Sequence, residues 1–341
     1  MEKLSIHKRR GNEKNFTLVG PFYLNGTDVS VIYFFIDGIG IGPDDQATNP
    51  FSRYATSVLS VCSASSRADA LSRDFLLLPL DAAMGIDGLP QSATGQTSLW
   101  TGVNAPQLLG HHLTGFPGPT LRAAIEEHSI LKKFKNEGFA ATLLNAYSEK
   151  FLKKLESMPR FASASTHTQK ASGQPLFTLA DLEAGRALYM DITHQIMHQY
   201  YPETKERFPI VDAHTRGADL VRIAQDYELV IFEYFLSDKA GHSQDFDAAQ
   251  FVIESLETFI KGICEAMGPD DTLIISSDHG NLEDLSTKTH THHRVPLLVY
   301  GRLMKDLAGD MQYLYDIPRR LYEIYGFALP PLILPQRPRA G

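Results

Sequence analysis

Three clusters of acidic residues and histidines in the last third of the chain have the residue types and spacing of metal ligands. Asp238 and His242 begin and end the run Asp-Lys-Ala-Gly-His, Asp278 and His279 are adjacent, and His290 follows. A carboxylate paired with an imidazole suits zinc, manganese or a related divalent ion. The clusters therefore predict a metalloenzyme.

Each cluster adjoins an apolar run that is typical of a buried strand. The runs cover 229–236, 272–277 and 295–300. Continuous apolar runs are characteristic of the central strands of a parallel sheet, and ligands of open α/β folds bind at the carboxyl ends of such strands. We therefore expect the clusters to lie at one edge of a sheet.

The N-terminal half adds another carboxylate and a possible nucleophile. Asp37 ends the apolar run 29–36 and is followed by Gly38, which permits a tight turn. The segment 89–102 is rich in small hydroxyl residues, and we expect a helix from Ser92 to Thr101. A helix N-terminus favours an anion, so this is a suitable place for a phosphate beside a nucleophile.

With these residues the chain resembles the alkaline phosphatase superfamily, and more closely its branch of phosphopentomutases and cofactor-independent phosphoglycerate mutases. The family patterns Asp-x-x-Gly-His and Asp-His-Gly-Asn are met at 238–242 and 278–281. The family histidine six residues before a strand proline is met by His290 and Pro296. The pieces occur in the family's order over roughly residues 29 to 301.

The resemblance implies a site for two divalent ions, zinc or manganese, with magnesium as a further option. The ligands that it implies for the first ion are Asp238, His242 and His290. Those that it implies for the second are Asp37, Asp278 and His279, completed by the oxygen of the nucleophile.

The family spacing also selects the nucleophile. Counting back from Gly95 gives Ser92 as the catalytic residue, with Thr94 as the alternative. One departure is Gln96, which stands where the mutases carry a histidine and so argues against mutase activity.

Three residues are candidates for contacts with the rest of the substrate. Gln96 lies in the nucleophile helix, His112 in the segment after that helix, and Asp45 in the segment after Asp37. For His112 and Asp45, ordinary turn formation is an equally good explanation.

Taken singly, most of these residues have a structural explanation. Asp37 alone could cap a helix, and His292 and His293 compete with His290 as ligands. Together, several carboxylates and imidazoles buried at one sheet edge would be costly without a cation, which favours the metal site.

The apolar pattern predicts a doubly wound, mostly parallel α/β sheet with helices on both faces and a small inserted lid. Strands are expected at 29–36, 76–80, 140–146, 229–236, 272–277 and 296–300, and helices at 92–101, 120–136, 214–226, 246–267 and 311–325.

The expected organisation is a metal-binding core interrupted by an insertion. The core covers 28–147 and 213–327, and the lid covers 148–212, with a Ser/Thr/Ala-rich loop at 160–174 and a helix at 178–200. Residues 1–27 form an N-terminal lead-in and 328–341 a proline-rich tail.

The composition restricts the partners. Of 341 residues, 32 are Lys or Arg and 40 are Asp or Glu, and the net charge of −8 argues against nucleic acid. Two cysteines provide no disulfide framework, and we find neither a signal peptide nor an apolar stretch long enough for a membrane. The expected location is the cytoplasm, and the expected partner is a small phosphate ester.

The sequence thus predicts a two-metal-dependent phosphoester hydrolase that acts on a small phosphorylated metabolite through a covalent phosphoserine at Ser92. The first alternative is a phosphomutase of a sugar phosphate or phosphoglycerate. The second is a non-catalytic binding protein stabilised by its metals.

Overall fold

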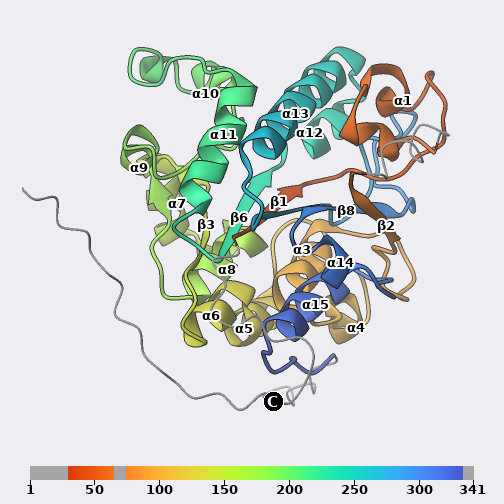
Figure 1. The fold of residues 1–341 in the computed structure, drawn as a ribbon. Helices are drawn as coiled ribbons and strands as arrows, with labels where there is room; N and C mark the ends of the chain where they lie inside the picture. The colour runs from red at the N-terminus through yellow and green to blue at the C-terminus, as the bar shows by residue number, and fades with distance from the viewer. Residues whose placement is uncertain (1–29, 65–73, 333–341) are drawn as a thin grey trace, which may run out of the picture.

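The computed structural model of the chain describes residues 30–64 and 74–332 (Figure 1). The lead-in expected at 1–27 and the last part of the expected tail, 333–341, lie outside the described residues.

A six-stranded sheet runs through the middle of the molecule in the order β2-β8-β7-β1-β6-β3. The strand β8 is antiparallel to both of its neighbours, and the contacts among β7, β1, β6 and β3 are parallel. The expected mostly parallel α/β sheet is therefore confirmed. The strands are β1 (Val31–Ile36), β2 (Leu76–Leu80), β3 (Ala141–Leu143), β6 (Leu229–Tyr234), β7 (Thr272–Ser276) and β8 (Val295–Gly301).

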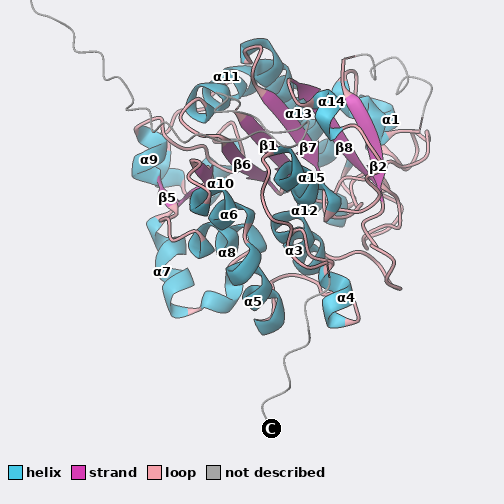
Figure 2. Ribbon diagram, turned by 60° about the horizontal axis from the view of Figure 1, so that its bottom comes forward, coloured by secondary structure: helices cyan, strands magenta, loops and turns pink. Residues whose placement is uncertain are grey.

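Helices cover both faces of this sheet (Figures 1 and 2). Because successive side chains of a strand point to opposite faces, Phe34 belongs to one hydrophobic core and Tyr33 and Phe35 to the other. The first core is completed by α1 (Pro50–Tyr54), α11 (Ala213–Ala224), α12 (Leu236–Ser243) and α13 (Phe246–Ala266). The second is completed by α3 (Ser92–Thr101), α5 (Pro119–His128), α6 (Ile130–Asn136), α8 (Ala164–Ala171) and α15 (Asp316–Ile324).

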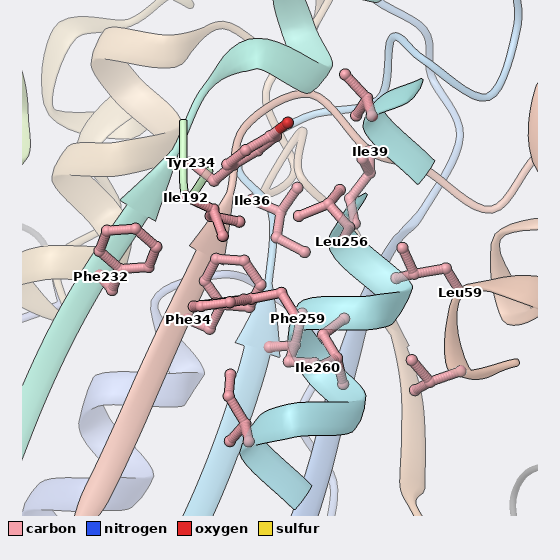
Figure 3. Packing of buried hydrophobic residues seen from close by; sticks show 14 of the residues in the cluster. Phe34, Ile36, Ile39, Leu59, Ile192, Phe232, Tyr234, Leu256, Phe259 and Ile260 are labelled. Carbon is pink, nitrogen blue, oxygen red and sulfur yellow. The ribbon is translucent and has the colours of Figure 1, made fainter. Parts of the chain in front are cut away.

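Aromatic packing fixes the central strands against α13 (Figure 3). The ring of Phe34 stacks on Phe232 at 5.7 Å between centroids and meets Phe259 edge-on at 5.1 Å. All three side chains are fully buried, and each such burial contributes about 1.5–3 kcal/mol to folding. The ends of β1 and β6, which carry the predicted ligands, thus stand on a rigid base.

The remaining elements are short. They are β4 (Ala146–Tyr147) paired with β5 (Phe177–Thr178), the helices α4 (Ala105–Leu109), α7 (Glu149–Ser157), α9 (Leu179–Glu183), α10 (Gln195–Tyr200) and α14 (Met304–Leu307), and the 3₁₀ turns Val58–Cys62, Pro159–Phe161 and Pro202–Thr204.

Two expectations for 148–212 are wrong. The expected loop at 160–174 contains the helix α8, which packs against α3 and α5, and the small side chains that suggested a loop are what allow this close packing. The single helix expected at 178–200 is divided into α9 and α10. Ile192 and His194 between them have positive φ values of 65° and 69°, which no right-handed helix can contain.

Two smaller expectations also need correction. The helix expected at 120–136 is broken at Ser129, whose extended backbone ends α5 and whose side chain caps α6. The strand expected at 140–146 ends at Leu143, and Ala146 joins the separate two-stranded sheet. Among the described residues, no helix combines the length and apolar character needed to cross a membrane.

Candidate metal centre

The carboxyl ends of three adjacent strands bring the predicted ligands together. Asp37 follows β1, Asp278 follows β7, and Asp238 lies in the first turn of α12, just after β6. Because β1 lies between β7 and β6 and is parallel to both, these side chains meet at one edge of the sheet.

Gly38 permits the close approach of the ligand segments. Its φ is +69°, and a Cβ at this position would lie 2.7 Å from Oδ1 of Asp238. A larger residue would therefore be strained in its backbone and would push Asp238 out of the site. The glycine after the first carboxylate thus has a specific steric role.

The first group of ligand atoms surrounds Nε2 of His279. This nitrogen lies 3.4 Å from Oδ1 of Asp37 and 3.5 Å from Oδ2 of Asp278. The hydroxyl oxygen of Ser92 is 3.0 Å from the same nitrogen. Three ligand atoms and a hydroxyl therefore face one point.

The second group surrounds the carboxylate of Asp238. Nε2 of His290 is 3.7 Å from its Oδ1, and Nε2 of His242 is 3.3 Å from its Oδ2. The other ring nitrogens are held by carbonyls, since His290 Nδ1 donates to Pro90 O and His242 Nδ1 donates to Lys288 O. This arrangement leaves Nε2 of both rings available as a ligand atom.

His279 lies between the two groups. Its Nδ1 is 4.0 Å from Oδ1 of Asp238, and its ring stacks on His290 with centroids 3.6 Å apart. The shorter distances are all on the Nε2 side, toward Asp37 and Asp278. The geometry therefore favours assigning His279 to the group that contains Asp37, which is also the assignment that the resemblance implied.

The electrostatics of the cluster are those of a cation site. Burial, followed by the charge of Asp278, raises the pKa of Asp37 well above its ordinary value. Burial, followed by the charge of Asp238, raises the pKa of Asp278 to about 7. Within 30–64 and 74–332, neither these carboxylates nor Asp238 form an ion pair with a lysine or arginine.

Among the described residues, two buried atoms of the cluster also find no hydrogen-bond partner. These are Oδ1 of Asp37 and Nδ1 of His279. Crowded carboxylates that lack a counter-charge, with imidazoles turned toward them, fit divalent metal ions.

Ser92 is the first residue of α3 and faces the cluster. The preceding Gln91 is extended, and the helix ends at Gly102 in the left-handed conformation. Gly95 lets the helix lie against Asp278, because a Cβ there would be 2.7 Å from the Asp278 carbonyl oxygen.

Thr94 is oriented differently. It is fully buried, its hydroxyl donates to Gln91 O, and the same oxygen accepts from Leu113 N. Its hydroxyl is therefore committed to the backbone, whereas that of Ser92 is directed at His279.

The three candidate substrate contacts have different surroundings. The side-chain amide of Gln96 is buried and donates to Asp278 Oδ2 at 3.1 Å and to Asp37 Oδ2 at 3.5 Å. His112 donates Nε2–H to Ile86 O in a separate hollow beside Asp87 and Gln91. Asp45 is exposed and accepts from Ala47 N and Thr48 Oγ1, as a turn residue does. The structure brings Gln96 to the cluster, but not the other two.

Sequence reasoning missed Glu233, a buried carboxylate on the inner strand β6. Ser165 donates a hydrogen bond to it, and burial raises its pKa to about 7. The signal was present in the sequence, because Glu233 is the only charged residue of the apolar run 229–236. An acidic residue inside a buried strand is seldom placed there by packing alone.

Glu283 was also missed, and it ties the ligand-bearing loops together. Its Oε2 accepts from Gly40 N and Asn281 N, both at 2.8 Å. Its Oε1 accepts from Thr291 Oγ1 and from His293 Nδ1. One fully buried carboxylate thus joins the segments that follow Asp37, His279 and His290.

A cavity of about 780 Å³ opens from the cluster. At its base lie Asp37, Ser92, Gln96, Asp238 and His242. Many of the other lining residues belong to 148–212, and the lining is rich in aromatic rings. The lining residues are Asp37, Ser92, Gln96, Gly115, Phe116, Asn145, Ala146, Tyr147, Ser148, Phe151, Lys154, Phe161, Ser163, Thr166, Tyr189, Met190, Tyr200, Tyr201, Glu233, Phe235, Asp238, Lys239 and His242.

The chain is similar in sequence to known metalloenzymes and phosphomutases. The family model of the Metalloenzyme superfamily matches residues 211–323, which contain five of the six predicted ligands. A 2,3-bisphosphoglycerate-independent phosphoglycerate mutase of Methylobacillus flagellatus is 31% identical over 117 residues, covering 32% of this chain and 23% of the relative. A phosphopentomutase of Kosmotoga olearia is 30% identical over 90 residues, covering 26% of this chain and 23% of the relative.

The matched part thus spans less than a quarter of the length of each of these two curated relatives. Among solved structures, the alkaline phosphatase of the Antarctic bacterium TAB5 aligns with 88% of this chain and 98% of its own, at 11% identity and a TM-score of 0.49. The resemblance to metalloenzymes with phosphopentomutase and cofactor-independent phosphoglycerate mutase relatives is confirmed, and residues 211–323 match the family model of the Metalloenzyme superfamily.

Proposed function

We propose that the protein is a metal-dependent phosphoester hydrolase in which Ser92 is the nucleophile. The observation that carries the proposal is the position of the Ser92 hydroxyl, 3.0 Å from His279 Nε2, where Asp37 and Asp278 also converge. A hydroxyl at a helix N-terminus beside a cation site has the surroundings of an activated nucleophile.

Six residues would hold two divalent ions, in two sets that share the sheet edge. The first set is Asp37, Asp278 and His279. The second is Asp238, His242 and His290, and His279 also lies within reach of Asp238 and His290. When bound, the ions would lower the pKa of the Ser92 hydroxyl and offset the negative charge of the phosphoryl oxygens. Zinc and manganese both suit this mixed oxygen and nitrogen set.

The chain's own residues would supply the nucleophile and orient the carboxylates. The oxygen of Ser92 attacks phosphorus, the bond to the leaving alcohol breaks, and a phosphoserine forms. A water molecule then attacks the same phosphorus, which releases inorganic phosphate and restores the Ser92 hydroxyl. Gln96, through its bonds to Asp278 and Asp37, would keep those carboxylates oriented.

The phosphomutase alternative shares all of these residues and differs in the final acceptor. In a mutase, the phosphoserine passes its phosphoryl group to another hydroxyl of the same substrate instead of to water. The mutase relatives favour this alternative, and Gln96 in place of their histidine argues against it.

The test is phosphate release by the zinc- or manganese-loaded protein from aryl and sugar phosphates. Metal-dependent release that is lost in Ser92→Ala supports the hydrolase. Isomerisation of a sugar phosphate without release supports the mutase. Tight metal binding with neither activity would refute both and leave a binding protein.

A further inference from the structure

Apart from the ligand cluster, eight aromatic rings line the cavity, and we call them the aromatic wall. Five of its eight members belong to 148–212, and the other three come from the core segments around it. The wall consists of Phe116, Tyr147, Phe151, Phe161, Tyr189, Tyr200, Tyr201 and Phe235.

Within the wall, rings are held in defined pairs. Tyr147 and Phe151 stack with centroids 5.3 Å apart and an interplanar angle of 13°. Phe116 and Phe161 meet edge-to-face at 5.6 Å. Phe116, Tyr200 and Phe235 nevertheless remain 46%, 55% and 39% exposed. Large rings left open around a concave site are available for a ligand.

Several polar groups of this side are already used by the protein. Both ends of the Asn145 amide bond the backbone of Glu233. The hydroxyl oxygens of Ser148 and Ser163 accept from Phe151 N and Thr166 N, as helix caps. A sugar with many hydroxyls would therefore find few free partners here, and unpaired polar groups are costly on binding.

Two positive charges accompany the rings. The Lys154 ammonium lies 5.3 Å from the ring centre of Phe161, and that of Lys239 lies 4.9 Å from the ring centre of Tyr200. Within the described parts of the chain, neither lysine is ion-paired with a carboxylate. An anionic ligand with a flat ring would thus find on one surface both aromatic rings to stack on and positive charges to offset its own.

We propose that the substrate is a phosphate ester that carries a planar aromatic ring, with the phosphate at Ser92 and the ring against the aromatic wall. The inference rests on the proposed function and narrows its substrate class. The cavity volume of about 780 Å³ is far larger than a phosphoryl group needs and suits a ligand of nucleotide size.

The test compares two probes that share the ribose and its 5-phosphate: adenosine 5′-monophosphate, which carries adenine at C1′, and ribose 5-phosphate, which carries a hydroxyl there. Each is titrated by calorimetry into the zinc-loaded Ser92→Ala protein, which cannot turn either over under the proposed mechanism. The nucleotide is expected to bind about tenfold more tightly, because stacking of one base on aromatic side chains has that order of effect. Equal affinities, or tighter binding of ribose 5-phosphate, would overturn the proposal.

A pair of variants tests whether the preference for the nucleotide arises at the aromatic wall. Phe151→Leu, placed in the Ser92→Ala protein, should lose most of the nucleotide preference and leave the affinity for ribose 5-phosphate within about twofold. The matched control is Tyr313→Leu, because Tyr313 also stacks on a neighbour, Tyr315, at 5.3 Å but lies outside the cavity. If Phe151→Leu unfolds, Phe235→Leu replaces it. An unchanged preference in the folded variant would refute the placement of the ring.

Phosphate release by the unsubstituted protein separates this proposal from the one on which it rests. Release from ribose 5-phosphate at the same kcat/KM as from adenosine 5′-monophosphate would retain the hydrolase and refute the substrate class. A tenfold binding preference without any release would retain the ring site and refute the hydrolase.

Discussion

The two sides of the cavity differ in how the fold produces them. Apart from His290, which precedes β8, the ligand cluster comes from the ends of β1, β6 and β7, and those positions follow from parallel strand pairing in a buried core. The aromatic wall is drawn from short helices and connecting segments, many of them in 148–212. The proposed chemistry is thus attached to the most regular part of the molecule, and the proposed substrate selection to the least regular part.

This difference leads to a clear expectation for mutations. Changes in the ligand cluster should alter metal binding or the rate for every phosphate ester. Changes in the aromatic wall should alter the choice of ester and leave the metal content unchanged. Four predictions test this division, in order of decreasing effect.

Ser92→Ala should lower phosphate release by about a thousandfold or more for all esters, because it removes the proposed nucleophile. The metal content, measured by atomic emission, should stay the same. Thr94→Ala is the control and should retain turnover, since the Thr94 hydroxyl bonds the backbone. Full activity of Ser92→Ala would exclude the phosphoserine.

The metal-free protein should become less stable as the pH rises. Burial raises the pKa of Glu233 from 4.5 to about 7 in the folded state, so the folded protein binds this proton more tightly than the unfolded chain does. The contribution of Glu233 to the free energy of unfolding is fully present below pH 4.5 and is lost as the pH rises through 7. The loss amounts to about 3 kcal/mol at most.

Urea unfolding of the metal-free protein at a series of pH values measures this contribution. Glu233→Gln should reduce the pH dependence, whereas Glu126→Gln, at an exposed surface residue, should leave it unchanged. Identical profiles for Glu233→Gln and the unsubstituted protein would contradict the prediction.

Glu283→Gln should weaken metal binding by about ten- to a hundredfold, as outer-shell substitutions do. The substitution replaces one accepting oxygen by an NH₂ group that faces donors, so the loops after Asp37, His279 and His290 lose their common anchor. Competition with a chelating dye measures the affinity. The neighbouring Asp284→Asn should change it by less than about twofold, and an equal effect of both variants would argue against the anchor.

Lys239→Gln should raise the KM for adenosine 5′-monophosphate by about threefold, the size expected of one exposed charge. The metal content should not change, although Asp238, the adjacent residue, is a proposed ligand. Lys205→Gln is the control for a general effect of surface charge. A loss of metal in Lys239→Gln would contradict the expectation that changes in the aromatic wall leave the metal content unchanged.

The ligand cluster could be predicted from the sequence because the patterns that indicate it are local. A carboxylate at the end of an apolar run marks both the strand and the site, and Asp37 and Asp278 could be placed on one sheet edge from their runs alone. The starts of β2 and α3 were predicted at Leu76 and Ser92, where the structure has them. The partners of β8 were not predicted, because antiparallel pairing leaves no separate signal in a short apolar run.

The aromatic wall could not be predicted in the same way. Phe116, Phe151 and Tyr200 lie in separate segments, and no spacing in the sequence links them. The backbone of 148–212 depends on tertiary contacts: the Asp191 carboxylate accepts from His194 N and Met197 N, which stabilises the positive φ before α10. The helix α8 is polar and small in composition, and only its burial against α3 and α5 makes it part of the interior.

The place of β1 in the sheet determines when the site can form during folding. This strand is made early, yet both of its edges remain unpaired until 229–234 and 272–276 have been synthesised. Pairings so distant in sequence form slowly, because a long loop must close before either strand adds stability. Asp37 can therefore meet Asp238 and Asp278 only after residues 229–278 have been synthesised, so the proposed ion sites cannot be complete before that point.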